Sequence, residues 1–137
     1  MNTASPPDPA RLFIDRDAWS NALGDALRKN DIDFVAHKEL FAQDSPDGEW
    51  IQRVSDEGWI GITRDQNIRR KPNEMSLIRG SKAMICVFTS GNLSAAMTAE
   101  ILLKALPKIR QLWNNPERPA LYSVHRDGKV TQLALDV

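Results

Sequence analysis

The sequence predicts a three-layer α/β fold, in which helices cover both faces of a mostly parallel central sheet and a β-hairpin follows at the C-terminal end. Short apolar runs alternate with helical patterns through the first hundred residues, as in chains that build parallel sheets. Residues 59–63 and 83–88 are almost continuously apolar, which is typical of strands covered on both faces. Asp127-Gly128 lies between two strand-like runs and is a strong hairpin signal.

Four strands are expected before the hairpin, and each is followed by a helical segment. The expected strands span residues 12–14, 33–37, 59–63 and 83–88, and the expected helices span residues 18–29, 46–57, 72–79 and a long segment that ends before a loop at 114–119. The expected N-terminal caps are Asp17, Ser45 (with Pro46 at the first helical position), and Asn92 or Ser94. Gly58 and Gly80 should end the second and third helices, and Pro107 should kink or divide the last one.

The ends of the chain complete the expected organisation. Residues 1–10 are rich in Pro, Ser and Asp and should form a disordered leader, so that residues 11–137 form a single domain. The runs at 121–125 and 130–135 should form the terminal hairpin, whose antiparallel strands lie at one edge of the sheet. The long helix before them is a candidate homodimer surface.

Composition excludes several function classes. The 137 residues carry a formal net charge of zero, so affinity for a polyanion has to come from a local patch. Cys86 is the only cysteine and lies in an apolar run, and only two histidines, His37 and His125, are present. Neither an intramolecular disulfide nor a structural zinc site is therefore expected. No apolar stretch reaches the roughly 18 residues of a membrane span and no signal peptide is recognisable, so we expect a cytoplasmic protein.

Several carboxylates follow the expected strands, at the edge where open parallel sheets bind ligands. Asp15 comes directly after the first strand, and Asp65 follows the third in Thr63-Arg64-Asp65. Further acids in the neighbouring segments are Glu39, Asp47, Glu49 and Glu74. These residues are far apart in sequence, but the carboxyl ends of parallel strands meet at one edge. The topology therefore predicts that several of the acids come together.

Clustered carboxylates repel one another unless a cation lies between them, and a hard divalent ion with oxygen ligands suits them. Mg²⁺ or Mn²⁺ at this edge would make hydroxide from water and stabilise the leaving oxyanion in phosphodiester cleavage. Each acid also has a local explanation. Asp15 could cap a helix, Asp47 could favour the helix dipole, and Asp65 could belong to turn chemistry. Glu39 and Glu49 could be solvated surface charges.

A basic run lies close to Asp65. It consists of Arg64, Arg69, Arg70 and Lys71, and Arg16 beside Asp15 could add to it. The simplest interpretation is that these basic side chains lie on a solvated loop and bind nothing. The alternative is a phosphate clamp, because Arg and Lys contacts to the backbone supply most of the sequence-independent affinity for nucleic acid. The position of the run beside the acidic edge favours substrate binding.

At these same residues the chain resembles the VapC-type PIN-like family of toxin ribonucleases. The matching pieces are FIDR at 13–16, FAQDSPDGEW at 41–50, GWIGITRD at 58–65, IRRKPNE at 68–74 and FTSGNLS at 88–94. Their order and spacing match over residues 12–110, which is most of the chain. The resemblance implies a PIN-like fold, dependence on Mg²⁺ or Mn²⁺, cleavage of RNA and, in many members, a cognate antitoxin protein as partner.

The resemblance also implies roles for individual residues. The expected catalytic residues are Asp15, Asp47 and Asp65, and the expected metal ligands are these three with Glu39. The residues expected to support the site are Glu74, Thr63 and Asn92. One departure from the family pattern concerns the acid that many PIN nucleases carry after the fourth strand, because this chain has Thr89-Ser90-Gly91-Asn92 there. Asn92 or Thr89 could hold a metal-bound water instead, or catalysis could be weak or absent.

Two alternatives to a nuclease stay open at this point. The missing acid after the fourth strand also fits an inactive PIN-like module that binds RNA or a protein through the same edge. A receiver-like phosphoacceptor domain would likewise place Asp at strand ends, with Thr or Ser after the fourth strand as in Thr89 and Ser90. No fifth parallel strand that delivers a lysine, and no acid pair after the first strand, is expected from the sequence, which counts against the receiver.

Overall fold

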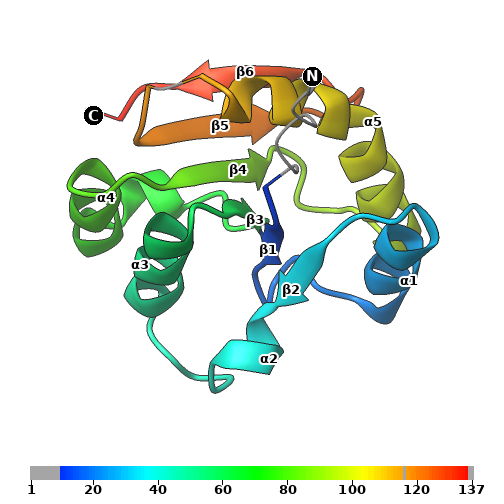
Figure 1. Cartoon of the computed structure of the whole chain (residues 1–137), viewed down its shortest axis with the longest axis horizontal. Helices are drawn as coiled ribbons and strands as arrows, with labels where there is room; N and C mark the ends of the chain where they lie inside the picture. Colours follow the sequence, from blue (N-terminus) through cyan, green and yellow to red (C-terminus); the bar gives the residue numbers. More distant parts are fainter. Residues whose placement is uncertain (1–9, 116, 136–137) are drawn as a thin grey trace, which may run out of the picture.

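A single six-stranded sheet organises the described part of the chain, residues 10–115 and 117–135 of a computed structural model (Figure 1). The strand order is β2-β1-β3-β4-β5-β6, and every neighbouring pair is parallel except β5 with β6. The strands are β1 (Leu12–Ile14), β2 (Phe34–Ala36), β3 (Ile60–Thr63), β4 (Met84–Phe88), β5 (Ala120–Val124) and β6 (Val130–Leu133). The expected leader, residues 1–10, lies outside the described residues except for Ala10.

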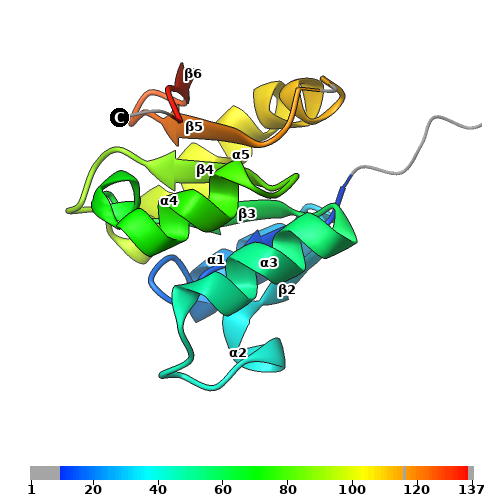
Figure 2. The same cartoon turned by 90° about the vertical axis from the view of Figure 1, so that its left-hand side faces the viewer.

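Helices cover both faces of the sheet. The helical elements are α1 (Asn21–Lys29), α2 (His37–Leu40), α3 (Asp47–Glu57), the 3₁₀ turn η1 (Ile68–Arg70), α4 (Pro72–Arg79) and α5 (Ala95–Trp113). Helices α1 and α5 pack against one face, and α3 and α4 pack against the other, where Figure 2 shows them in front of the sheet. The expected α/β class with three layers is therefore confirmed. Within the described ranges no helix is both long and apolar enough to cross a membrane.

The strand side chains alternate between two cores. In β1, Leu12 and Ile14 point toward the core beneath α1 and α5, while Phe13 points toward the core beneath α3 and α4. All three are almost fully buried. Strands β4 and β5 alternate in the same way, because successive side chains of a strand point to opposite faces. Burial on both faces explains why these runs are almost continuously apolar.

The register of the sheet places the ends of distant strands side by side. Ile14 pairs with Ile62, so Asp15 and Thr63 stand next to each other where β1 and β3 end. The Asp15 N–H continues this pairing by donating to the Ile62 carbonyl at 2.9 Å. Phe88 likewise pairs with Val124, and the strand ends of β4 and β5 therefore lie along the same edge.

Two of the expected helix starts were wrong. Helix α1 begins at Asn21, not at Ala18, and its cap is Ser20, whose hydroxyl accepts from the Leu23 N–H at 3.0 Å. Asp17 does not cap it, because residues 15–19 first form a turn in which the Asp15 carbonyl accepts from the N–H groups at 18 and 19. Helix α3 begins at Asp47 with Pro46 as its cap residue and no capping side chain. Ser45 turns instead toward the buried His37, 3.3 Å from its Nε2.

The C-terminal hairpin also differs from the expectation in one respect. Strand β5 pairs in parallel with β4, and only β6 is antiparallel. The sequence reading therefore missed a fifth parallel strand, because the hairpin signal reports how β5 pairs with β6 but not how it pairs with β4. Helix α5 carries the chain back across the sheet between β4 and β5, is capped by Ser94 rather than Asn92, and is not divided at Pro107.

Candidate active site

Asp15 is the most buried acid of the expected set. Its side chain lies at the end of β1 and is 3% exposed. One carboxylate oxygen accepts from the Arg16 N–H at 2.8 Å, and the other accepts from the Thr63 hydroxyl at 2.9 Å. Burial, together with the negative charges of Asp17 and Asp47, raises the pKa of Asp15 to about 7, although its two hydrogen bonds oppose the shift. The ionised form of Asp15 is therefore energetically unfavourable unless a cation lies close to the carboxylate.

Thr63 connects Asp15 to Asp65. The threonine is fully buried at the end of β3, and its hydroxyl accepts from the Asp65 N–H at 3.1 Å. The hydroxyl proton is shared between Asp15 and Asp17, whose oxygens lie 2.9 and 3.2 Å away. Asp17 also accepts from the Arg64 N–H at 3.0 Å. Through these hydrogen bonds, Thr63 connects the loop after β1, which carries Asp15 and Asp17, to the loop after β3, which carries Asp65.

Asp65 and Asp47 meet on the ammonium group of Lys71. Lys71 Nζ lies 2.5 Å from Asp65 Oδ2 and 3.3 Å from Asp47 Oδ2. The hydrogen bond that Lys71 donates to Asp65, reinforced by the negative charges of Asp65 and Asp47, raises the pKa of Lys71 despite partial burial. The side chains of Asp47 and Asp65 are only 16% and 17% exposed. These ion pairs are therefore shielded from water more than ordinary surface pairs are.

Arg16 holds Asp47 from the other side. Its guanidinium donates to Asp47 Oδ1 at 3.0 Å and to the carbonyls of Gln43 and Ser45 at 2.8 and 2.9 Å. The indole N–H of Trp50 donates to the same carboxylate oxygen at 3.2 Å, from within the first turns of α3. Arg16 and Trp50 therefore position Asp47, and the loop before α3 in turn holds the guanidinium of Arg16.

These contacts link six residues in a ring at the carboxyl edge of the sheet, and two of the links, from Arg16 to Asp15 and from Asp65 to Thr63, are donated by backbone N–H groups. In order around it are Asp15, Thr63, Asp65, Lys71, Asp47 and Arg16, and below we call this set the carboxylate ring. It draws on the ends of β1 and β3, the start of α3 and the segment before α4. The structure therefore brings together the three expected catalytic acids, although their segments are separated by up to fifty residues.

The other expected residues lie around the ring or away from it. Glu39 is exposed and accepts from the Ala36 N–H at 2.6 Å, so it closes the first turn of α2 and has no hydrogen bond to the ring. Glu74 is half-buried in the first turn of α4, and Asn92 is exposed before α5. The structure brings none of these three into hydrogen-bonding contact with the ring acids.

The expected basic residues divide into two groups. Lys71 and Arg16 are part of the ring, whereas Arg64 donates to the Gly91 carbonyl at 2.8 Å. Arg70 is exposed on η1, next to the half-buried Arg69. These three surround the ring without an ion pair to its acids in the described ranges.

The donor chemistry of the ring suits a hard divalent cation. Asp15, Asp47 and Asp65 offer only carboxylate oxygens, and the raised pKa of Asp15 shows that its charge lacks compensation. Their spacing is set by Lys71 and Arg16, and in the described residues no three ligand side chains already stand at metal-binding spacing. A metal would thus have to take the place of the lysine ammonium between Asp47 and Asp65.

Asp17 is a member of this neighbourhood that the sequence reading passed over. Its carboxylate shares the Thr63 hydroxyl with Asp15 and contributes to the raised pKa of that residue. The acid-x-acid spacing directly after β1 was a usable signal. The sequence alone predicts a helix cap at Asp17, because an Asp before a helical pattern is commonly a cap.

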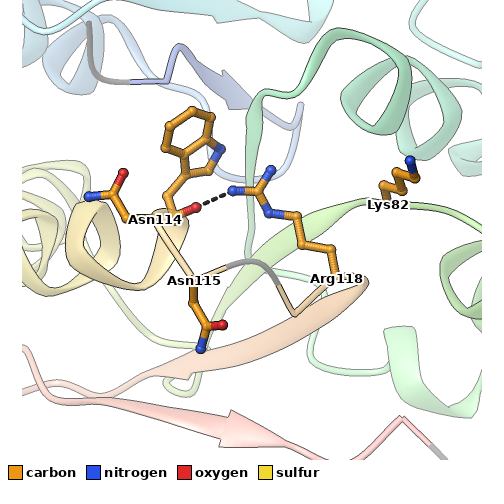
Figure 3. Close-up of a pocket in the computed structure, with 5 residues that line it drawn as sticks. Lys82, Asn114, Asn115 and Arg118 are labelled. Carbon is orange, nitrogen blue, oxygen red and sulfur yellow. Dashed lines mark hydrogen bonds between the residues drawn. The ribbon is translucent and has the colours of Figure 1, made fainter. Parts of the chain in front are cut away.

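A separate hollow of about 400 Å³ lies near the opposite edge of the sheet (Figure 3). The residues that line it are Lys82, Trp113, Asn114, Asn115 and Arg118. The guanidinium of Arg118 lies over the indole ring of Trp113, 4.8 Å from its centroid, and donates to the Trp113 carbonyl. Among the described residues that line this hollow there is no carboxylate and none of the expected site residues.

Comparisons with known proteins identify sequences that are similar to this chain. The family described as "PIN like domain" matches residues 10–90, more than half of the chain, and this segment contains the whole carboxylate ring. A protein of Mycobacterium tuberculosis (strain ATCC 25618 / H37Rv), named "Putative ribonuclease VapC45", is similar at 26% identity over 122 residues. The match covers 86% of this chain and 88% of that protein. No solved structure is a significant match.

Proposed function

The chain belongs to the PIN-like domain family, as its sequence pieces led us to expect, and on this premise we propose that it is a metal-dependent endoribonuclease. The observation that carries the proposal is the carboxylate ring, in which Asp15, Asp47 and Asp65 share one edge of the sheet. Parallel sheets bind their ligands at this edge. The name of the mycobacterial relative supports RNA as the substrate.

Within the proposal, Asp15, Asp47 and Asp65 would hold Mg²⁺ or Mn²⁺. When bound, such an ion supplies a nucleophilic water at neutral pH and stabilises the oxygen that leaves. Thr63 keeps Asp15 and Asp65 in fixed relation through its hydroxyl. Arg16 and Lys71 provide positive charge at the same edge, where they attract the phosphate backbone.

We also propose that the protein acts as the toxin of a toxin–antitoxin pair, with a cognate antitoxin as partner. The resemblance of the site pieces to VapC-type toxins supports this role. Controlled expression of the wild-type chain in a bacterial host should then arrest growth, and expression of Asp15→Asn at the same level should not. Growth arrest that is equal for both variants would contradict a toxic ribonuclease.

Cleavage of a 5′-labelled single-stranded RNA of mixed sequence, with Mn²⁺ or with chelator, tests the enzymatic proposal. Asp15→Asn and Asp65→Asn should each lower the rate by at least about a hundredfold, the order expected when a charge-stabilising group is removed. Asp25→Asn is the matched control, because the Asp25 side chain is 80% exposed on α1 and forms a surface pair with Arg28. A double variant at positions 15 and 65 that cleaves at the wild-type rate would refute the proposal.

A second candidate is a PIN-like module that binds RNA or a protein without cleaving. The observations that favour it are the ion pairs that already neutralise Asp47 and Asp65, and the Thr89-Ser90-Gly91-Asn92 segment, which has no acid after β4. Titration calorimetry separates the two candidates. The nuclease requires Mn²⁺ binding that Asp65→Asn weakens, whereas the module shows no divalent-ion binding at millimolar concentration. The family match does not favour the receiver-like alternative, which we leave aside.

A further inference from the structure

A groove of about 520 Å³ lies over the ends of β4 and β5, along the same edge as the carboxylate ring. It is lined by Thr89, His125, Arg126, Asp127, Lys129 and Thr131. We propose that this groove binds a nucleotide of the single-stranded RNA that flanks the phosphodiester cleaved at the ring. The inference rests on the proposed function and extends it by a substrate-binding subsite.

The groove adjoins the ring through two loop contacts. Gln66, the neighbour of Asp65, donates from its side-chain amide to the Thr89 carbonyl at 2.9 Å. Arg64 reaches the same loop and donates to the Gly91 carbonyl at 2.8 Å. The segments after β3 and β4 are therefore fastened together, and a strand of RNA that crosses Asp65 continues over Thr89 into the groove.

The charges of the groove suit a phosphate. Arg126 and Lys129 are exposed, and neither takes part in an ion pair within the described ranges. The carboxylate of Asp127 is engaged in the hairpin turn, where it accepts from the Lys129 N–H at 3.0 Å. Two cationic side chains are thus available to a polyanion, although the chain as a whole carries no net charge.

The ring and hydroxyl groups of the lining suit a base. His125 is half-buried, and its Nε2 lies 2.8 Å from the Thr131 hydroxyl, which in turn lies 2.8 Å from the hydroxyl of the buried Ser123. These contacts hold the imidazole ring in place. RNA-binding proteins stack unpaired bases on aromatic rings, including histidine, and read their edges with polar groups such as the hydroxyls of Thr89 and Thr131.

The size of the groove fits the same ligand. Pockets for small ligands occupy about 300–1,000 Å³, and the groove volume of about 520 Å³ falls within this range. A phosphate on Arg126 and Lys129 and a base against His125 together account for most of the lining. A nucleotide uses both kinds of group, because its phosphate pairs with a cation and its base stacks on an aromatic ring.

Binding of RNA can be measured without cleavage in an Asp15→Asn background. The probe is a fluorescein-labelled single-stranded decaribonucleotide, followed by fluorescence anisotropy at several salt concentrations in the presence of chelator. Addition of Arg126→Gln and Lys129→Gln should weaken binding at least fivefold. It should also lower the magnitude of the salt slope by about 0.7 for each phosphate contact that is lost.

The matched control removes two basic residues at the other edge of the sheet. Arg28→Gln with Lys29→Gln changes the net charge equally, and both residues lie in the last turn of α1, away from the groove. This variant should bind RNA within twofold of its parent. Equal losses for both pairs would mean that only net charge matters, and no loss for the Arg126 and Lys129 variant would leave the groove to another ligand, such as a protein. Either result overturns the inference.

His125 tests the stacking part of the proposal. His125→Ala should weaken RNA binding severalfold. His125→Phe should retain most of the binding, because phenylalanine keeps an aromatic ring on which a base can stack. A small loss is expected, because phenylalanine cannot contact the Thr131 hydroxyl. Loss in both variants would contradict stacking.

Cleavage assays separate this inference from the proposed function. If the wild-type chain cleaves RNA and the Arg126 and Lys129 variant has a raised KM with an unchanged kcat, both proposals stand. If the variant cleaves with an unchanged KM, only the groove is refuted. If the wild-type chain does not cleave, the nuclease proposal fails, even where the groove still binds RNA.

Discussion

Lys71 Nζ stands 2.5 Å from Asp65 Oδ2, in a position where the same ammonium group also reaches Asp47 at 3.3 Å. A single lysine thus bridges two of the three acids to which we assign metal binding. A divalent cation and Lys71 are attracted to the same oxygen atoms, and both cannot occupy the space between them. The relationship makes Lys71 a competitor of the metal and gives the first prediction.

Lys71→Gln should bind Mn²⁺ more tightly than the wild-type chain, because the metal no longer displaces an ammonium group. The expected gain is about three- to tenfold, which corresponds to an ion pair worth about 1 kcal/mol. Titration calorimetry measures it directly. Arg70→Gln is the control, since Arg70 is the exposed basic neighbour with no ion pair in the described ranges, and its affinity should be unchanged. Weaker Mn²⁺ binding by Lys71→Gln would show that the lysine assists the metal instead.

Asp15 should make the stability of the fold depend on pH when divalent ions are chelated. Its pKa is about 7 in the folded protein, against 3.8 for the unperturbed group, so the folded state holds an extra proton between these values. The contribution of Asp15 to the free energy of unfolding should therefore be highest below about pH 4. It should fall by on the order of 4 kcal/mol as the pH rises toward 7, at about 1.4 kcal/mol for each unit of pKa difference. Chemical denaturation across this range measures the trend.

Asp15→Asn should remove most of that pH dependence and stabilise the protein at pH 8, because asparagine carries no charge to bury. Its amide can still meet Thr63, whose hydroxyl can then donate to Asp17. A variant whose unfolding free energy follows the wild-type curve between pH 4 and 8 would show that another group causes the slope.

Metal binding should be coupled to proton release near neutral pH. Because the pKa of Asp15 is raised to about 7, the side chain still binds a proton near neutral pH, and a cation would expel it on binding the carboxylate. Calorimetry in buffers of different ionisation enthalpy should detect the released protons, and the Mn²⁺ affinity should begin to fall below pH 7. An affinity that stays constant down to about pH 4, where ordinary carboxylates start to protonate, would exclude Asp15 as a ligand.

Thr63→Val should damage both stability and cleavage. It leaves a buried carboxylate oxygen of Asp15 and the Asp65 N–H without the hydroxyl that they contact, at a cost of about 1–3 kcal/mol. Thr63→Ser keeps the hydroxyl and should retain most of the activity. Thermal unfolding and the RNA cleavage rate measured side by side test this, and equal behaviour of the two variants would contradict a role for the hydroxyl.

The local elements follow from local patterns. The strand Leu12–Ile14 and the helix Pro72–Arg79 have the bounds that we expected, because a short apolar run, a proline at the first helical position and a terminal glycine act over a few residues. Asp15 and Asp65 were also expected at one edge, since parallel strands align their carboxyl ends. Sequence patterns thus suffice for the fold class and for the edge at which Asp15 and Asp65 lie.

The assignment of each polar side chain to a partner could not be made from the sequence. Glu39 closes the turn at Ala36, and Asp17 shares the hydroxyl of Thr63 instead of capping a helix. Each acid had several partners within reach of its segment, and the packing of distant segments selected one of them.

The sequence by itself determined the alternation of strands and helices, the two cores, and the acids that follow β1 and β3. Tertiary structure alone decided that β5 joins β4 in parallel and that Lys71 lies between Asp47 and Asp65. The physical reason is the range of the forces involved. Apolar periodicity and capping act within one element, whereas strand pairing and charge neutralisation depend on groups that are brought together only when the whole sheet has formed.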